Sequence, residues 1–264
     1  MLKFTVLVLV VLFANAKGSV QRIAGGNPTY INEYPFVAAL LTNGGQGTSY
    51  TQACAGSILT NRAILSAASC FYTNAVVNQP SWWRARVGST RANSEGTVYM
   101  INLITVHDNY VTATQVNDLA ILRSVLPIAF NANVAPARIA GIAYPYGVNQ
   151  MVWALGWGAT SSTSPTLSQE LHVVQMWLIN LQTCQNNYAS TAFIVNDNMV
   201  CAGLPDVGVV GQCTGDAGGP LLDSEGAVIG VFSRSQGCGD AAYPSINTRV
   251  ASFTRWIVNT ALAQ

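Results

Sequence analysis

Charge is scarce in this sequence, and lysine is almost missing. Only 9% of the 264 residues are charged while 50% are hydrophobic, which excludes an intrinsically disordered chain. The formal net charge of +1 gives no basic surface for nucleic acid or for an anionic membrane. Both lysines, Lys3 and Lys17, lie near the start, and every later cation is an arginine. Arginine keeps its charge at a pH where lysine loses it, so the bias suits an alkaline compartment; drift in a charge-poor chain explains it equally well.

The sequence also lacks the run of about 20 apolar residues that a membrane-spanning helix needs. The apolar run Phe4–Phe13 is shorter, follows Lys3 and precedes the small-residue triplet Ala14-Asn15-Ala16. This order is typical of a secretory signal peptide, whereas an N-terminal core helix would need a polar periodicity that is absent. We therefore predict that residues 1–16 are a signal peptide, that the protein is secreted and extracellular, and that it has no membrane partner.

Signals for a metal or a cofactor are missing as well. None of the six cysteines forms a C-x-x-C pair, and the only histidines, His107 and His172, lie far from any cysteine pair. In a secreted chain six cysteines instead indicate disulfide bonds, although the sequence alone leaves their pairing open. We predict no metal and no cofactor.

Short apolar runs separated by turn residues fill the first half of the chain. They lie at Pro35–Leu41, Ser57–Thr60, Ala63–Ser66, Arg84–Gly88, Val98–Val106 and Leu119–Arg123. This spacing is typical of an all-β protein, an antiparallel sandwich or barrel, and the length suits one structural unit. Helices are expected at Leu181–Tyr188 and at Ser252–Ala263, and no solenoid repeat is present.

One stretch carries a specific chemical signal, Cys213-Thr214-Gly215-Asp216-Ala217-Gly218-Gly219-Pro220. It resembles the nucleophile loop of trypsin-like (chymotrypsin-fold) serine proteases, which reads G-D-S-G-G-P. The one departure is Ala217, which stands where the family has its serine. A methyl group has no lone pair with which to attack a carbonyl carbon.

Other segments extend the resemblance over about Ile23 to Gln264. Gln21-Arg22-Ile23-Ala24-Gly25-Gly26 resembles the activation junction R-I-V-G-G, and Gly156-Trp157-Gly158 resembles the G-W-G of the second barrel. The resemblance implies two six-stranded antiparallel β-barrels with a short C-terminal helix, a propeptide at 17–22 and a protease domain at 23–264. It also implies that cleavage after Arg22 frees an Ile23 ammonium to pair with Asp216. The disulfides that it implies are Cys54–Cys70, Cys184–Cys201 and Cys213–Cys238.

The same resemblance assigns the catalytic positions. Ser69, before Cys70, stands where the family has T-A-A-H-C, and a serine hydroxyl cannot act as a general base near neutral pH. Asp118, in a segment similar to N-D-I-A-L-L, keeps the family's aspartate and is expected beside Ser69 as a structural remnant. The backbone N–H groups of Gly215 and Ala217 would form the oxyanion hole, because they need no side chain.

The specificity pocket departs from the trypsin pattern. The family's pocket aspartate is replaced by Gly211, and Arg234 replaces an aromatic residue in Ser233-Arg234-Ser235. Side chains at two positions that are glycine in the family narrow the pocket, as in elastase-like members. Those positions are Ser235 and Ser245. We therefore expect the pocket to reject Lys and Arg side chains and to accept small ones.

Taken together, these departures predict that the chain is not an enzyme. We expect a monomeric, catalytically inactive serine protease homologue that binds a peptide, a protease inhibitor or another protease. The arginine bias resembles that of moth and butterfly midgut trypsins, which favours an alkaline gut lumen. The alternative is an active serine-type endopeptidase with non-standard catalytic groups and small-residue specificity. A purely structural secreted component has no supporting repeat, and an introduced substrate-trapping alanine does not account for Ser69 or the altered pocket.

Overall fold

A computed structural model describes residues 26–161, 164–205, 207–208 and 210–263. The predicted signal peptide, the propeptide, Arg22 and Ile23 therefore lie outside the described residues. Within the described part, no helix is long and apolar enough to cross a membrane.

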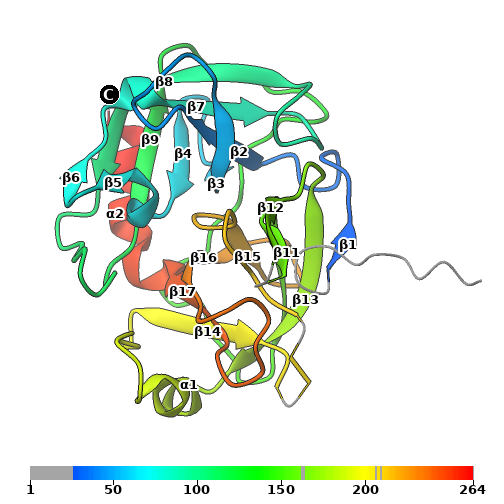
Figure 1. Cartoon of the computed structure of the whole chain (residues 1–264), viewed down its shortest axis with the longest axis vertical. Helices are drawn as coiled ribbons and strands as arrows, with labels where there is room; N and C mark the ends of the chain where they lie inside the picture. Colours follow the sequence, from blue (N-terminus) through cyan, green and yellow to red (C-terminus); the bar gives the residue numbers. More distant parts are fainter. Residues whose placement is uncertain (1–25, 162–163, 206, 209, 264) are drawn as a thin grey trace, which may run out of the picture.

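The first half of the chain forms a closed antiparallel barrel (Figure 1). Its neighbouring strands follow the order β2-β3-β4-β9-β8-β7. Their bounds are β2 Val37–Thr42, β3 Thr51–Ile58, β4 Ala63–Ser66, β7 Trp83–Val87, β8 Thr97–Val106 and β9 Ala120–Ser124. Between β4 and β7 lie the 3-10 helix η1 (Ala68–Phe71), the short hairpin β5 (Tyr72–Thr73) and β6 (Val76–Val77), and the 3-10 helix η2 (Pro80–Trp82).

The second half closes in the same way. Six strands follow the order β13-β10-β15-β16-β17-β14, pairing of β13 with β14 closes the ring, and β1 adds to β13 at an edge. Their bounds are β1 Asn27–Pro28, β10 Met151–Gly156, β13 His172–Ile179, β14 Met199–Gly203, β15 Pro220–Leu222, β16 Val228–Arg234 and β17 Ser245–Arg249. A separate hairpin joins β11 (Ala159–Ser161) to β12 (Ser164–Leu167). The predicted pair of six-stranded antiparallel barrels is thus confirmed.

The predicted strands and helices mostly fall where the apolar pattern placed them. The run Ala63–Ser66 coincides with β4, which is buried along its whole length, and Leu181–Tyr188 coincides with α1. The exception is Ser57–Thr60, which covers only the end of β3, because the polar residues earlier in that strand interrupt the apolar run. Helix α1 begins where it does because the Asn180 side chain accepts hydrogen bonds from the N–H groups of Gln182 and Thr183.

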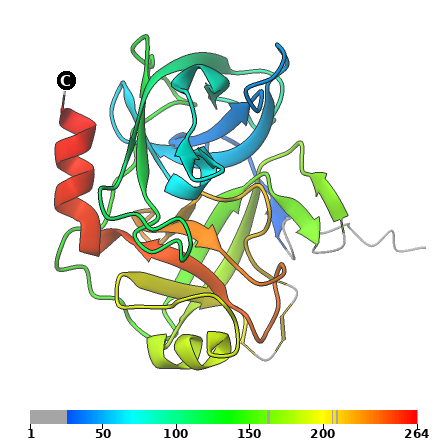
Figure 2. The same ribbon diagram turned by 60° about the vertical axis from the view of Figure 1, so that its left-hand side comes forward.

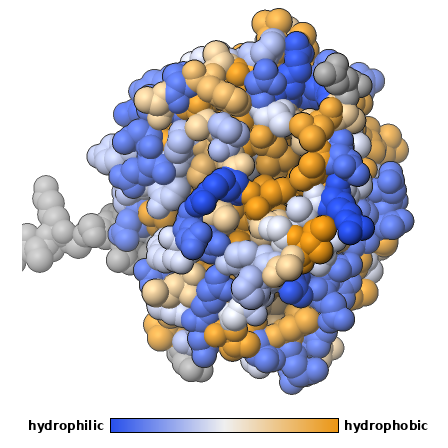
Figure 3. Space-filling view, turned by 180° about the vertical axis from the view of Figure 1, so that it is seen from behind, coloured by the Kyte–Doolittle hydropathy of each residue, from blue (hydrophilic) through white to orange (hydrophobic). Residues whose placement is uncertain are grey.

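Helix α2 (Val250–Leu262) follows the second barrel but packs against the first (Figure 2). It contacts β4 and β9 of the first barrel and β16 of the second. Val250, Phe253 and Ile257 bury one face of the helix in a core cluster that includes residues of both barrels. Seen from behind the view of Figure 1, the surface shows hydrophobic residues near its middle with hydrophilic ones on both sides, and further hydrophobic residues at its edges (Figure 3).

Three disulfides link neighbouring segments, and they join the pairs that the resemblance implied. They are Cys54–Cys70, Cys184–Cys201 and Cys213–Cys238. The first ties β3 to η1, the second ties α1 to β14, and the third ties the predicted nucleophile loop to the segment after β16. The first and third therefore fix loops that meet between the two barrels.

Candidate functional site

A cleft of about 480 Å³ lies where the two barrels meet. The first barrel contributes Ala53, Cys54, Ser69 and Cys70, a connecting loop contributes Gln115, and the second barrel contributes the rest. The second-barrel residues are Cys213, Thr214, Gly215, Ala217, Phe232, Ser233, Arg234, Ser235, Gly237 and Cys238. Of the described residues that line the cleft, Arg234 alone carries a charge, so the cavity is mostly neutral and polar.

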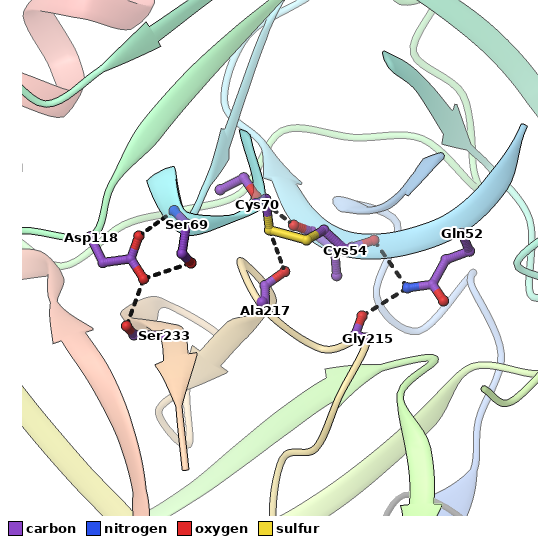
Figure 4. Close-up of a disulfide and its surroundings, with 10 residues drawn as sticks. Gln52, Cys54, Ser69, Cys70, Asp118, Gly215, Ala217 and Ser233 are labelled. Carbon is purple, nitrogen blue, oxygen red and sulfur yellow. Dashed lines mark hydrogen bonds between the residues drawn. A yellow bond between two sulfur atoms is a disulfide. The ribbon is translucent and has the colours of Figure 1, made fainter. Parts of the chain in front are cut away.

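Asp118 joins the two barrels at one wall of this cleft (Figure 4). Its Oδ1 accepts a hydrogen bond of 2.7 Å from the Ser69 N–H, and its Oδ2 accepts one of 2.8 Å from Ser69 Oγ. A third bond, of 2.6 Å, comes to Oδ2 from Ser233 Oγ on β16. Ser69 belongs to η1, so its hydroxyl and the carboxylate are brought together by elements of one barrel, and Ser233 approaches from the other.

The Asp118 carboxyl is fully buried, and this burial raises its pKa above the ordinary value. The hydrogen bonds from Ser233 and Ser69 and the nearby charge of Arg234 oppose that rise because they stabilise the carboxylate. A carboxylate with a raised pKa accepts a proton more readily than an exposed one. Ser69, which is only partly buried, therefore presents a hydroxyl to the cleft that is already hydrogen-bonded to a potential base.

The loop from Cys213 to Pro220 is fixed from both sides. The Thr214 carbonyl accepts a hydrogen bond of 2.7 Å from the N–H of Ala159 at the start of β11. The Ala217 carbonyl accepts one of 2.9 Å from the N–H of Ala55 on β3. Gly215, between them, has a φ of 95°, a conformation that glycine adopts without strain.

The N–H groups of Gly215 and Ala217 have no hydrogen-bond acceptor among the described residues, and both residues line the cleft. Two unpaired backbone donors beside a cleft are the arrangement that stabilises an oxyanion during acyl transfer. The Ala217 side chain is a half-buried methyl group at the place predicted for a nucleophile. Position 217 of the loop therefore offers a backbone donor but no attacking atom.

Asp216 belongs to this loop, and its side chain is fully buried. Its Oδ1 accepts from the N–H of Gly158 at 2.7 Å and its Oδ2 from the N–H of Cys213 at 2.9 Å. Desolvation raises its pKa to about 7, and the two backbone hydrogen bonds offset only part of the rise. A Cβ on Gly156 or Gly158 would overlap the Asp216 carboxylate, so both glycines of the G-W-G segment make room for it. Its expected partner, the Ile23 ammonium, lies outside the described residues.

The structure separates the residues predicted for the specificity pocket. Ser233, Arg234 and Ser235 line the cleft, whereas Gly211 and Ser245 are buried behind it, where the Gln212 N–H donates to Ser245 Oγ at 3.3 Å.

Arg234, which was predicted from the sequence to replace an aromatic residue of the pocket, is largely buried in the wall of the cleft. It is only 7% exposed, donates to the carbonyls of Gln115 and Ile194, and lies over the ring of Phe193. Burial lowers its pKa. It thus forms part of the cleft wall, because the side chain is long enough to reach carbonyl groups of two separate loops.

Neither histidine belongs to the cleft lining. The ring of His107 packs between Phe253 and Trp256 of α2, and burial lowers its pKa. His172 begins β13, is fully buried, and places Nδ1 2.7 Å from the carbonyl oxygen of Glu170. Both histidines therefore pack in structural surroundings outside the cleft lining.

The sequence reasoning missed one buried residue that supports the loop beside the cleft. Gln52 on β3 donates from Nε2 to the Gly215 carbonyl at 2.8 Å and to the Cys54 carbonyl at 3.1 Å (Figure 4). It belongs to no motif that we used, and its partner Gly215 is 163 residues away in the sequence. Its position two residues before a disulfide-bonded cysteine is the only local signal that could have drawn attention to it.

Comparison with known proteins places this geometry in a family. Residues 23–257 match the family model described as Trypsin. The chain is 47% identical to "Trypsin, alkaline C" of Manduca sexta over 90% of this chain and 91% of that protein. It is also 47% identical to "Trypsin CFT-1" of Choristoneura fumiferana, with 90% of each chain covered, and 44% identical to "Achelase-1" of Lonomia achelous, with 80% of this chain and 96% of that protein covered.

These relatives correct one prediction. Proteins that share 47% of their residues with this chain over 90% of its length carry the name trypsin, which points to a serine protease. The prediction that the chain is not an enzyme, which rested on the departures at the catalytic positions and in the pocket, is therefore contradicted. The extent of the match, the two barrels and the three disulfides lead to one conclusion: the chain belongs to the trypsin family.

Proposed function

We propose that this protein is a serine-type endopeptidase of the trypsin family that uses Ser69 as its nucleophile and Asp118 as its general base. The observation that carries the proposal is the 2.8 Å hydrogen bond from Ser69 Oγ to a buried carboxylate whose pKa is raised, at the edge of a cleft. A serine hydroxyl becomes a nucleophile when an adjacent base can take its proton. The family matches and the names of the relatives support peptide hydrolysis.

The chemical step follows from these contacts. Ser69 Oγ attacks the carbonyl carbon of the scissile peptide, and its proton passes to Asp118 Oδ2. The unpaired N–H groups of Gly215 and Ala217 supply donors for the negative charge that forms on the carbonyl oxygen. When the C–N bond breaks, the departing amine takes the proton back from Asp118. Water then hydrolyses the ester on Ser69 by the same proton transfers in reverse, which restores the free hydroxyl.

Ser233 distinguishes this site from an isolated serine–carboxylate pair. Its hydroxyl also donates to Asp118 Oδ2, at 2.6 Å, but Ser233 is buried whereas Ser69 is only partly so. Both serines border the cleft, and we assign Ser69 to attack and Ser233 to holding the carboxylate in place, because Ser69 is the more exposed of the two. Ser69→Ala and Ser233→Ala therefore form a matched pair of variants, because each removes one hydroxyl that donates to Asp118 Oδ2.

The substrate that fits this cleft is a peptide with a small, uncharged side chain at the cleaved position. No acidic side chain lines the cleft among the described residues, and the guanidinium of Arg234 lies in its wall. A Lys or Arg side chain of a substrate would be left unpaired there, and leaving a charge desolvated and unpaired is costly. This specificity differs from that of a pocket with a carboxylate at its base, which accepts Lys and Arg side chains. The proposed substrates are therefore peptides or proteins with a small residue at the cleaved position.

The proposal also includes the domain boundaries and the location predicted from the sequence. Residues 1–16 serve as the signal peptide, 17–22 as the propeptide, and 23–264 as the protease domain, so the protein works outside the cell, as a monomer. The alkaline gut lumen is the compartment that the arginine bias and the moth relatives favour.

The test uses a serine-directed fluorophosphonate probe and a peptide library, with the site of labelling mapped by mass spectrometry. We expect the probe to label Ser69 and the protein to cleave after small residues. Ser69→Ala should abolish labelling and cleavage, whereas Ser233→Ala should reduce the rate and leave Ser69 labelled.

A second variant controls for the scaffold. Ser69→His combined with Ala217→Ser places an imidazole and a new hydroxyl in the same cleft, and its cleavage of the library shows that the cleft binds peptide. If that variant cleaves while the unmodified protein neither reacts with the probe nor cleaves any peptide, the assignment of Ser69 and Asp118 to catalysis is wrong.

A further inference from the structure

Gln52 is a buried amide at the junction of the two barrels. It is 4% exposed, and its single Nε2 group bridges two backbone carbonyls, that of Cys54 on its own strand β3 and that of Gly215 in the facing loop. Its Oε1 is buried and has no hydrogen-bond partner among the residues that the structure describes. A buried amide oxygen without a partner costs free energy, so the residue is not placed there for stability alone.

The contact between Gln52 and Gly215 matters because the N–H of Gly215 is one of the two proposed oxyanion donors. The peptide group before Gly215 is held by the Ala159 N–H on the Thr214 carbonyl, and the peptide group after it is held by Gln52 on the Gly215 carbonyl. The Gly215 N–H belongs to the first of these peptide groups, and the second is held at its other end by the Asp216 N–H, which donates to the Cys213 carbonyl at 3.0 Å. The bond from Gln52 therefore acts on the Gly215 N–H by restricting the φ and ψ angles of Gly215 between the two groups. A glycine at a φ of 95° without such bonds has more backbone freedom than any other residue.

We propose that Gln52 is a positioning residue for oxyanion stabilisation: through the Gly215 carbonyl, it holds the Gly215 N–H toward the cleft. The inference rests on the proposed function only in that it uses the same N–H donors; it does not depend on which atom attacks. Gln52 acts through Gly215 and does not itself touch the substrate. Because it reaches from the first barrel to a loop of the second, it also makes the donor's direction depend on how the barrels meet.

The experiment measures binding rather than turnover. A phosphinic peptide carries a tetrahedral, anionic phosphorus group that resembles the intermediate of peptide cleavage, and the matched amide peptide does not. Isothermal titration gives the dissociation constant of each ligand for the unmodified protein and for Gln52→Met, which keeps the length of the side chain but removes the donor. We expect the phosphinic peptide to bind the unmodified protein more tightly. Gln52→Met should reduce that preference about tenfold and leave the affinity for the amide peptide unchanged.

Two controls separate positioning from a loss of structure. Gln46→Met makes the same substitution at an exposed glutamine of the β2–β3 connection and should leave the preference unchanged. In Gln52→Glu, the protonated carboxyl can still donate to the Gly215 carbonyl but the carboxylate cannot. The preference should therefore be kept at low pH and lost as the pH rises through the pKa of the new carboxyl, whereas Gln52→Met should show no such pH dependence.

The outcomes are separable from those of the catalytic proposal. Ser69→Ala should keep the preference for the phosphinic peptide, since binding needs no nucleophile. An unchanged preference in Gln52→Met would overturn the inference, and so would the absence of any preference in the unmodified protein. Failure of the fluorophosphonate test, in contrast, removes Ser69 as the nucleophile and leaves the role of Gln52 to be decided by these titrations.

Discussion

Asp216 is a fully buried carboxyl group whose negative charge is disfavoured by desolvation. Its pKa is raised to about 7 because the carboxyl is desolvated and receives only two backbone hydrogen bonds. Because the pKa is higher in the folded than in the unfolded state, protonation of this carboxyl contributes to the free energy of unfolding. The contribution is fully present below pH 3.8, the ordinary pKa, and is lost as the pH rises toward about 7.

We therefore expect the uncleaved chain to lose thermal stability between about pH 4 and pH 7. Asp216→Asn should flatten that part of the profile, as differential scanning fluorimetry across the range would show. Cleavage after Arg22 should flatten it as well if the freed Ile23 ammonium pairs with Asp216. A profile that is the same in the uncleaved chain and in Asp216→Asn would show that another group controls it.

Gly156 carries a second prediction at the residue scale. A Cβ there would overlap the Asp216 carboxylate, which is fully buried. Gly156→Ala should lower the free energy of unfolding by about 1–3 kcal/mol, as overpacking does in other cores. Gly141→Ala is the matched control, because its Cβ would have no atom within 4 Å. Equal urea midpoints for the two variants would contradict this account of the G-W-G segment.

At the scale of the secondary-structure elements, the disulfide Cys184–Cys201 ties α1 to β14, and neither cysteine lines the cleft. Replacing both cysteines with serine should destabilise the protein by about 3 kcal/mol, as expected for a loop of this length, and leave peptide binding unchanged. Chemical denaturation and titration with the phosphinic peptide test the two halves of this prediction. A variant that folds but loses binding would show that α1 supports the cleft.

The elements were predictable where the cause of their formation is local. The strand β4 is buried on both faces and reads as a continuous apolar run, and α1 has an asparagine cap, so both ends of each could be predicted. The start of β3 was missed because Gln52 and its neighbours break the apolar pattern for a reason that lies in another barrel. The wall position of Arg234 could not be predicted either, since its partners Gln115 and Ile194 are 119 and 40 residues away.

At the scale of the whole molecule, α2 joins the two barrels, because it leaves the second and buries its apolar face against the first. Ile257→Ala, at a position with no exposed surface, should cost about 2–5 kcal/mol. Since the core beneath this helix is shared, both barrels should unfold in one transition at the lowered midpoint. Val258→Ala, on the 41% exposed side, should have little effect. Two separate calorimetric transitions in Ile257→Ala would show that the barrels are stabilised independently.

The loop that carries Ala217 is held by the Cys213–Cys238 disulfide, by the Asp216 side chain and by backbone carbonyls, but not by the side chain at position 217. The Thr214, Gly215 and Ala217 carbonyls are all engaged, while the Ala217 methyl group only borders the cleft. The shape of the loop is therefore independent of the side chain at position 217, and evolution can exchange that residue without rebuilding what surrounds it. A substitution at position 217 can therefore remove or restore a nucleophile while the hydrogen bonds that fix the loop stay the same.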